Sequence, residues 1–350
     1  MKAVQLIAHG IPGKFELRDL PDPQPAAGEV VVQVQACGLN HIDLWLEEGG
    51  LPMPLALPRT SGSEIAGRIV AVAADVSEWK ADDRAAVQSN LFCGQCQYCR
   101  RKEESMCLKN VILGVGHDGG FAEKVLVPSR AIVRLPDNVN FATSAALTLA
   151  GSTAMHMLTT RAQVREGDWV LVIAGASGVG SAAIQIARQL GARVISTGST
   201  ESKRALARQL GAEVALDLAK DSWPAEVRAI TGKRGVDLVI EHVGGEVLQQ
   251  VFNCLARGGT VVTCGATAGR EMQMDLWPFF VKQQRLIGSY GRDSADFKAT
   301  LEWAAAGKLK PVIDSTFPLG ETPAAFARLR SREALGKVLV EPFAPCAESD

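Results

Sequence analysis

The chain has 350 residues, which is more than one ordinary domain needs and suits two. Its 47% hydrophobic and 21% charged residues are typical of a globular α/β protein. Lysine and arginine number 37 against 38 aspartates and glutamates, so the net charge is −1. Because no excess of positive charge is available for a phosphate backbone or an acidic bilayer, we expect neither nucleic acid nor a membrane as a partner.

The N-terminal residues, Met1 to Gln5, lack the charged-then-apolar order of a signal peptide. The longest apolar stretches, such as residues 169–174, have the length of a strand and not of a membrane span. We therefore expect a cytoplasmic protein. Four of the eight cysteines lie close together in the sequence, and in a reducing compartment such clustering favours a metal site over disulfides.

The first ~125 residues are rich in short β-like runs broken by proline and glycine, and helical periodicity is scarce there. This pattern predicts a barrel-like β lobe. The expected strands are residues 29–35, 64–73 and 121–127.

Within that lobe, Cys93, Cys96, Cys99 and Cys107 have the spacing C-x2-C-x2-C-x7-C. Four thiolates without a histidine complete a tetrahedral zinc site and leave no open position for a substrate. We therefore predict one structural zinc in a lobe spanning about residues 92–108. The other cysteines are isolated and are expected to be small core or surface residues: Cys37, Cys254, Cys264 and Cys346.

From Trp169 onward, apolar strands alternate with amphipathic helices, which is the pattern of βαβ units around a parallel sheet. The pattern changes after about Leu286, and residues 345–350 are expected to be a frayed tail. The expected strands are residues 170–173, 193–197, 214–216, 238–241, 260–264 and 336–340, and the expected helices are residues 178–190, 203–210 and 295–305.

The first strand of this series leads directly into Gly175-Ala176-Ser177-Gly178-Val179-Gly180, which opens a helix. The run matches the G-x-G-x-x-G fingerprint except that Ser177 replaces the middle glycine. Glycines allow a tight turn, so the N-terminus of the helix can face a pyrophosphate. In this strand–turn–helix context the run predicts a dinucleotide site, the alternative being a packing turn without a ligand.

The next strand, residues 193–197, indicates which dinucleotide binds. A site for NAD usually carries a carboxylate at the end of this strand. Here Ser199 and Thr200 follow instead, with Lys203 just beyond them. Hydroxyls and a cation suit a 2′-phosphate, so we predict NADPH as the cofactor. The alternative is that Lys203 and Arg204 only decorate a solvated helix face.

Five stretches combine with the four-cysteine lobe: residues 1–4, 37–43, 62–64, 175–180 and 286–290. Together they resemble the medium-chain dehydrogenase/reductase superfamily over nearly the whole chain. The resemblance implies an α/β protein with two domains. These are a GroES-like catalytic domain, residues 1–150 and 290–350, and a Rossmann doubly wound parallel sheet, residues 151–289, inserted between its two segments.

The same resemblance implies an active site in the cleft and a homo-oligomer, either a dimer or a tetramer. It also implies that four residues line the nicotinamide: Thr153, Cys264, Gly265 and Ser289.

Departures from the family pattern indicate a branch. Zinc alcohol dehydrogenases bind a second, catalytic zinc, but the ligand positions here hold Asn40, Ser63 and Leu149. The residue at the proton-relay position is Ile42, which cannot relay a proton. Residues 40–43, 62–64 and 174–180 are instead similar to the zinc-free quinone oxidoreductase and enoyl reductase branch. We interpret the chain as a quinone-reductase-like active site beside a retained structural zinc lobe.

Without a catalytic metal, a simple ketone or alcohol is hard to activate, whereas quinones and α,β-unsaturated carbonyls need less help. We therefore expect hydride transfer from NADPH to such a small-molecule acceptor. Asn40 is a candidate donor to the acceptor carbonyl or to the nicotinamide ribose, and His41 and Tyr290 are candidate proton donors. Two alternatives stay open. One is an alcohol or aldehyde dehydrogenase with displaced metal ligands, for example near Cys37 and His41; the other is a catalytically idle NADPH-binding sensor or scaffold.

Overall fold

A computed structural model of the chain describes residues 1–344. The tail expected at residues 345–350, with Cys346 in it, lies outside the described residues. The chain divides into two compact units. The first unit comprises Met1–Ala150 and Arg292–Asp350, and the second comprises Gly151–Gly291. The sequence placed the second boundary between residues 289 and 290.

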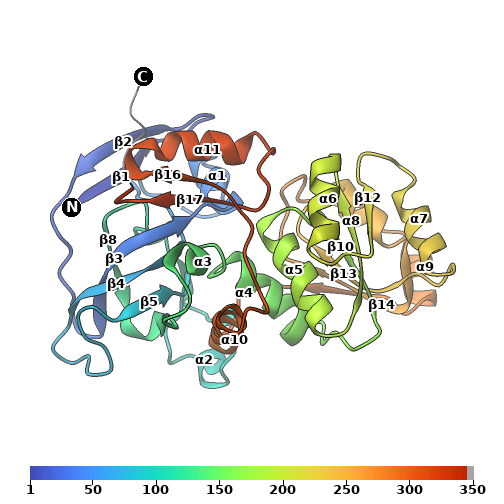
Figure 1. Ribbon diagram of the computed structural model, residues 1–350, viewed down its shortest axis with the longest axis horizontal. Helices are drawn as coiled ribbons and strands as arrows, with labels where there is room; N and C mark the ends of the chain where they lie inside the picture. Colours follow the sequence, from blue (N-terminus) through green and yellow to red (C-terminus); the bar gives the residue numbers. More distant parts are fainter. Residues whose placement is uncertain (345–350) are drawn as a thin grey trace. The chain divides into compact units, whose positions relative to one another are not determined.

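The first unit is built on a seven-stranded sheet in the order β16-β17-β3-β4-β5-β9, with β8 also paired to β3 (Figure 1). Its central strand β3 (Glu29–Gly38) buries Val30, Val31 and Val32 in succession, because protein covers both faces of the sheet. The other strands of the sheet are β4 (Glu64–Val72), β5 (Arg84–Val87), β8 (Lys124–Pro128), β9 (Ile132–Arg134), β16 (Ile313–Pro318) and β17 (Lys337–Glu341).

The expected β-rich first part of the chain is thus confirmed, although the third expected strand begins at Lys124 and not at Phe121. Two small antiparallel pairs complete the strands of this unit. They are β1 (Lys2–Ala8) with β2 (Lys14–Asp19), and β6 (Asn90–Leu91) with β7 (Val111–Ile112).

The C-terminal segment enters this sheet beside β3. Strand β17 pairs antiparallel with β3, with Leu339 opposite Gly38 and Val340 opposite Cys37. Helix α11 (Thr322–Arg330) connects β16 to β17, which run parallel. This pairing brings Lys337 to the end of β3, where Asn40 lies, although the two residues are 297 positions apart.

The sequence did not predict several short helices of the first unit. Helix α1 (His41–Glu48) begins at Asn40, whose side chain and that of Asp43 form a capping box, and it ends at Gly49 in the left-handed region with φ 75°. A helix of this length shows too few turns for a clear period. The others are α2 (Gln97–Arg100), α3 (Phe141–Ala145) and the 3₁₀ turns Glu104–Met106, Ser129–Ala131 and Leu319–Glu321; the expected helix near residue 300 is α10 (Ser294–Ala305).

The second unit is a six-stranded, fully parallel sheet in the order β12-β11-β10-β13-β14-β15, as the alternating pattern predicts (Figure 1). The strand order reverses at β10, from which the chain builds outward in both directions. In such doubly wound sheets, ligands bind beyond the carboxyl ends of the strands at this reversal. The strands are β10 (Trp169–Val172), β11 (Arg193–Gly198), β12 (Val214–Asp217), β13 (Val236–Glu241), β14 (Leu255–Thr263) and β15 (Arg285–Gly288).

Helices connect these strands. Helix α5 follows β10 and buries Ile184 and Ile186 on the face it turns to the core, so the expected helix from residue 178 is confirmed. Within the described residues, no helix is long and apolar enough to cross a membrane. The helices are α4 (Ala150–Met155) with its π-helical continuation His156–Arg161, α5 (Gly178–Gln189), α6 (Glu201–Gln209), α7 (Trp223–Ile230), α8 (Gly245–Val251) and α9 (Leu276–Val281).

Candidate functional site

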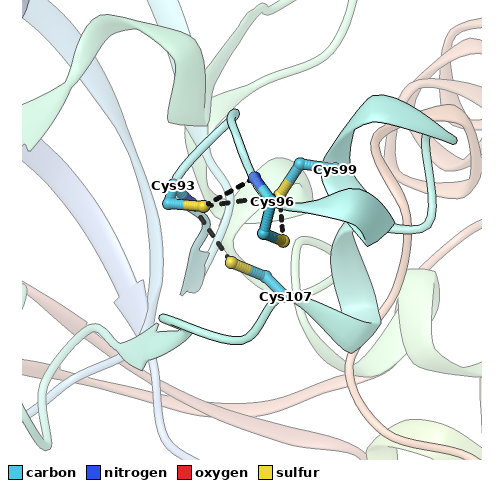
Figure 2. Close-up of side chains that lie close together, drawn as sticks. All are labelled: Cys93, Cys96, Cys99 and Cys107. Atoms are coloured by element: carbon cyan, nitrogen blue, oxygen red, sulfur yellow. Dashed lines mark hydrogen bonds between the residues drawn. The ribbon is translucent and has the colours of Figure 1, made fainter.

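The four clustered cysteines of the first unit turn their sulfur atoms toward one another (Figure 2). All four sulfurs lie within 4.8 Å of one another; the Sγ atoms of Cys96 and Cys99 are 3.5 Å apart and those of Cys93 and Cys99 are 3.9 Å apart. Zinc bound tetrahedrally at ≈ 2.3 Å from each thiolate holds the sulfurs about 3.8 Å apart. The cluster therefore fits a zinc ion closely.

Backbone N–H groups surround these sulfurs as they do in thiolate metal sites. The amide of Cys93 donates to Cys107 Sγ over 3.3 Å, and that of Cys96 donates to Cys93 Sγ over 3.4 Å. The backbone N–H of Cys99, and to a smaller extent that of Leu108, lowers the pKa of the Cys96 thiol to about 6. Such donors favour the thiolate of Cys96, which is the form that binds metal, whereas burial raises the pKa of the Cys99 thiol to about 12.

The cysteine lobe is tied to helix α10 of the same unit. The amide of Ser105 donates to the Asp293 carboxylate over 2.8 Å, and the amide of Ser294 donates to Glu104 over 3.2 Å. A metal site needs three or more histidine, cysteine or carboxylate side chains close together. Among the described residues, the four cysteines are the only such group whose members all lie within one unit.

The cofactor candidates of the second unit gather at the carboxyl ends of its parallel strands. Residues 175–180 follow β10 and residues 199–203 follow β11. Cys264 and Gly265 follow β14, and Ser289 and Tyr290 follow β15. Because parallel strands end at the same edge of a sheet, these residues share the edge at which doubly wound sheets bind ligands. Thr153 lies buried in helix α4 of the same unit.

The turn after β10 is tightly packed. A Cβ atom at Gly175 would lie 2.1 Å from Ser196 Oγ, and one at Gly180 would lie 2.4 Å from the Ala174 carbonyl oxygen. Both glycines are thus required for the strand–turn–helix packing. The Ser177 hydroxyl caps α5 by accepting from the Gly180 amide over 2.9 Å. Gly178 and Val179 open the helix, where N–H groups have no partner within the helix and can bind an anion such as a pyrophosphate.

Beyond β11 lie the two hydroxyls and the lysine on which the sequence-based prediction of NADPH depends. Thr200 caps α6 through the Lys203 amide, and Lys203 Nζ lies 3.5 Å from Ser199 Oγ. The neighbouring Arg204 is engaged elsewhere, because its guanidinium contacts Asp217 over 3.1 Å and Glu201 over 3.0 Å. Of the two cations, Lys203 is therefore the one that groups with the hydroxyls.

His242, which the sequence analysis did not single out, belongs to the same edge. It follows β13, and its Nε2 lies 2.8 Å from the Ser177 hydroxyl that caps α5. Glu241 before it is fully buried and accepts from the Gly244 amide over 2.7 Å and from the Thr263 hydroxyl over 2.8 Å. His242 could have been predicted from its position directly after a parallel strand, because ligands bind at the carboxyl ends of such strands.

At the ends of β14 and β15 the candidates differ in exposure. Cys264 is half-buried, and desolvation raises the pKa of its thiol to about 12, which disfavours the thiolate near neutral pH. The Ser289 hydroxyl has no hydrogen-bond partner among the described residues. Tyr290 is 53% exposed.

In the first unit, Asn40 is held by two charged residues that the sequence analysis gave no role. Lys337 Nζ donates to Asn40 Oδ1 over 2.7 Å, and Asn40 Nδ2 donates to Glu64 Oε2 over 3.0 Å. Lys337 and Glu64 also contact each other directly, with 2.6 Å between Nζ and Oε2, and both are buried. The three residues form a closed group, the Asn40 cluster.

His41 and Asp43 flank this cluster on helix α1. Asp43 is fully buried and accepts from the amides of Asn40 over 2.8 Å and Gly62 over 3.0 Å. Burial raises the pKa of Asp43 to about 6. His41 is exposed by surface area, yet desolvation, followed by repulsion from Lys337 and Arg332, lowers its pKa to about 4. The His41 imidazole is therefore neutral at pH 7.

The remaining positions where the resemblance puts a catalytic zinc are also occupied by other contacts. The buried Ser63 hydroxyl donates to the Leu113 carbonyl over 2.7 Å, and the Leu149 amide donates to Glu64 over 2.7 Å. Cys37 is buried so tightly that a Cβ atom at Gly62 would lie 2.7 Å from its sulfur, and burial raises the pKa of its thiol. Cys37 and His41 do not fall together in a metal-binding group.

Two family models match the chain. The alcohol dehydrogenase GroES-like domain matches residues 26–137, in the first unit. The zinc-binding dehydrogenase domain matches residues 178–306, most of which lie in the second unit. These matches confirm the expected fold class, a GroES-like domain combined with a Rossmann sheet.

Individual relatives cover nearly the whole chain. An NAD-dependent alcohol dehydrogenase from Sulfurisphaera tokodaii is 30% identical over 98% of this chain and 100% of its own length. The crystal structure of an NAD-dependent alcohol dehydrogenase matches with 36% identity and a TM-score of 0.94, covering 97% of this chain and 99% of the other. A cobalt- and zinc-bound thermostable alcohol dehydrogenase from Pyrobaculum aerophilum is 29% identical with a TM-score of 0.88, covering 98% and 99%. The chain therefore belongs to the medium-chain dehydrogenase/reductase superfamily of oxidoreductases.

Proposed function

We propose that this oxidoreductase transfers hydride from NADPH to a quinone or an α,β-unsaturated carbonyl compound, without a catalytic metal and with one structural zinc. The observation that carries the proposal is the state of the three expected ligand positions. Asn40 is engaged by Lys337 and Glu64, the Ser63 hydroxyl by Leu113, and the position of the third ligand is an aliphatic leucine. None of these positions offers a thiolate or an imidazole.

This set of residues suits an acceptor that needs little activation. A metal stabilises the charge that develops on a simple carbonyl oxygen, and the Asn40 cluster offers only hydrogen bonding in that role. In a conjugated acceptor the developing charge is delocalised, so orientation beside the hydride donor contributes more. Asn40 Nδ2 has one hydrogen directed at Glu64, while the other has only the Gly38 carbonyl at 3.4 Å. That second hydrogen is the one we assign to the acceptor carbonyl.

The second unit supplies the groups for NADPH, which provides the hydride when bound. The N-terminus of α5 suits the pyrophosphate, and Ser199, Thr200 and Lys203 suit the 2′-phosphate. His41 and Tyr290 remain the candidate proton donors. We favour Tyr290 or solvent, because the imidazole of His41 is neutral near pH 7 and the N–H of a neutral imidazole is a far weaker acid than a phenol.

The names of the relatives favour a second candidate, an alcohol dehydrogenase using NAD. That function would require a metal held by residues other than Asn40, Ser63 and Leu149. It would also require the edge beyond β11 to accept a cofactor without a 2′-phosphate.

A turnover screen separates the two candidates. The purified protein is assayed for oxidation of NADPH and NADH with a panel of quinones and enones, and for reduction of NADP⁺ and NAD⁺ with primary and secondary alcohols. We expect oxidation of NADPH by a conjugated acceptor and poor turnover of alcohols. Efficient alcohol oxidation with no reaction of conjugated acceptors would replace the proposal by the second candidate. Cofactor binding with no turnover at all would favour an idle binding protein.

A further inference from the structure

We propose that Lys337 is the positioning residue of the Asn40 cluster: its ammonium group occupies the place of a bound cation there and sets the orientation of the Asn40 amide. The catalytic part of this inference rests on the proposed function, since it assigns Asn40 to the acceptor carbonyl. Three oxygen atoms converge on Lys337 Nζ. They are the Leu39 carbonyl oxygen, Asn40 Oδ1 at 2.7 Å and Glu64 Oε2 at 2.6 Å.

The ammonium group is fully used by these contacts. It carries three N–H donors and no acceptor, so three oxygens saturate it. Lys337 is only 4% exposed and is the first residue of β17. The residues that follow it in β17 pair with the end of β3, just before Asn40. A rigid strand therefore delivers the charge, and no rotation of a surface side chain is needed.

Glu64 completes the arrangement from the other side. One of its oxygens accepts from Lys337 Nζ and Asn40 Nδ2, and the other accepts from the amides of Leu149 over 2.7 Å and Ala150 over 2.9 Å. Asn40 thus lies with its amide oxygen against a cation and its amide nitrogen against a carboxylate. The reversed amide would place its N–H₂ group against the ammonium and its oxygen against the carboxylate, so electrostatics select one orientation.

The same three oxygens are of the type that binds hard cations. A backbone carbonyl, an amide oxygen and a carboxylate are ligands preferred by Mg²⁺, Ca²⁺ and Mn²⁺. With Lys337 Nζ at their centre the position is filled. Removal of the side chain beyond Cβ should open a small cavity that accepts either a primary ammonium ion or Mn²⁺.

The test compares Lys337→Ala with Arg330→Ala. Arg330 is the matched control because it too pairs with a buried carboxylate, that of Glu47, which lies at the end of helix α1 opposite Asn40. Both variants should lose thermal stability. The value of kcat is measured, well below the melting temperature, on whichever reaction the wild-type enzyme catalyses. Lys337→Ala should lower kcat roughly 10- to 100-fold, because a small misplacement of an orienting group has effects of that size. Arg330→Ala should leave kcat unchanged.

Chemical rescue supplies a readout that a merely structural role would not move. Propylammonium matches the part of the side chain that Lys337→Ala removes, so it should raise both the melting temperature and kcat of this variant in a saturable way. It should do neither for Arg330→Ala. Mn²⁺, followed by electron paramagnetic resonance, should bind Lys337→Ala but not the wild type, and Lys337→Ala/Glu64→Gln should not bind it.

Three results would overturn the inference. The first is a wild-type kcat for folded Lys337→Ala, and the second is a rescue of stability by propylammonium without a rescue of kcat. If Lys337→Ala does not fold, the double variant Lys337→Met/Glu64→Gln is used, because it removes both charges and keeps the packing. The third result that would overturn the inference is a wild-type melting temperature together with a wild-type kcat in this double variant. Propylammonium and Mn²⁺ binding need no acceptor, so failure of the enone reaction in the wild type would count against the proposed function alone.

Discussion

The two units position their functional groups in different ways. In the second unit, the candidate residues follow the ends of neighbouring parallel strands, so the sheet itself brings them together. In the first unit, they meet through the cysteine lobe and through the contact of Lys337 with Asn40, a residue 297 positions away. The difference indicates what substitutions should do. Loss of a group in the first unit should affect stability, because a buried charge or a metal is left without partners, whereas loss of a group in the second should chiefly affect cofactor binding.

The largest effect is expected in the cysteine lobe. Cys99→Ser removes a buried ligand and should abolish zinc binding, because three thiolates no longer close the tetrahedron. We expect the melting temperature to fall by roughly 10 °C, as a loss of several kcal/mol would produce in a chain of this size. Calorimetry together with zinc content measures this. The control, Cys254→Ala, changes a buried cysteine of the second unit and should leave zinc content unchanged; a zinc-free Cys99→Ser of wild-type stability would contradict the assignment.

The next effect concerns Asp43 and depends on pH. Its pKa of about 6 in the folded chain exceeds the ordinary value of ~3.9, so the folded state binds the proton more tightly than the unfolded state. The stability contributed by this group is therefore present below pH ~4 and is lost as the pH rises through about 6. Relative to Asp43→Asn, the free energy of unfolding of the wild type should fall by up to ~3 kcal/mol as the pH rises from ~4 to beyond about 6.

Urea denaturation of both proteins across this pH range measures that difference, with Asp19→Asn at an exposed site as the control. A stability difference between wild type and Asp43→Asn that stays constant with pH would show that burial does not shift the pKa of Asp43 in this way.

In the second unit, Lys203→Ala should weaken cofactor binding without unfolding the protein. Because Lys203 lies beside Ser199 at the end of β11, the variant should raise the Kd for NADPH roughly 10-fold and change that for NADH little. Fluorescence titration measures both constants, and Lys220→Ala, at an exposed lysine of the same unit, is the control. Equal losses for the two cofactors, or tighter binding of NADH by the wild type, would remove the basis for NADPH selectivity.

The smallest effect is expected at Ser177. Ser177→Ala removes the cap of α5 and the contact with His242, so stability should fall by about 1 kcal/mol, the usual effect of losing an N-cap. Ser177→Gly should destabilise less, because glycine is a tolerable cap and restores the usual fingerprint. Ser177→Ala should weaken the binding of NADPH and of NADH to the same extent, since both cofactors carry the pyrophosphate. A selective loss of NADPH would show that Ser177 serves the 2′-phosphate.

The sequence was most informative where function depends on neighbouring residues. The spacing of Cys93 to Cys107 predicted a cluster whose sulfurs do converge, and the run from Gly175 to Gly180 predicted the turn between β10 and α5. Both signals lie within one short segment, and each residue type has a clear geometric role.

The sequence was least informative where partners are distant. Nothing near Lys337 marks it as the partner of Asn40 and Glu64, because only the pairing of β17 with β3 brings them together. His242 was missed for a milder reason, as it follows a recognised strand but carries no motif of its own. Helix α1 was missed because its length is set by the cap at Asn40 and the left-handed Gly49 and not by a long apolar period.

Hydride transfer without a catalytic metal is tested by measuring the metal content per chain together with activity during mild chelation. We predict one zinc per chain, bound by Cys93, Cys96, Cys99 and Cys107, and activity that declines only as the folded fraction declines. A metal content near two per chain, with activity lost before stability falls, would show instead that a catalytic metal binds outside the four cysteines.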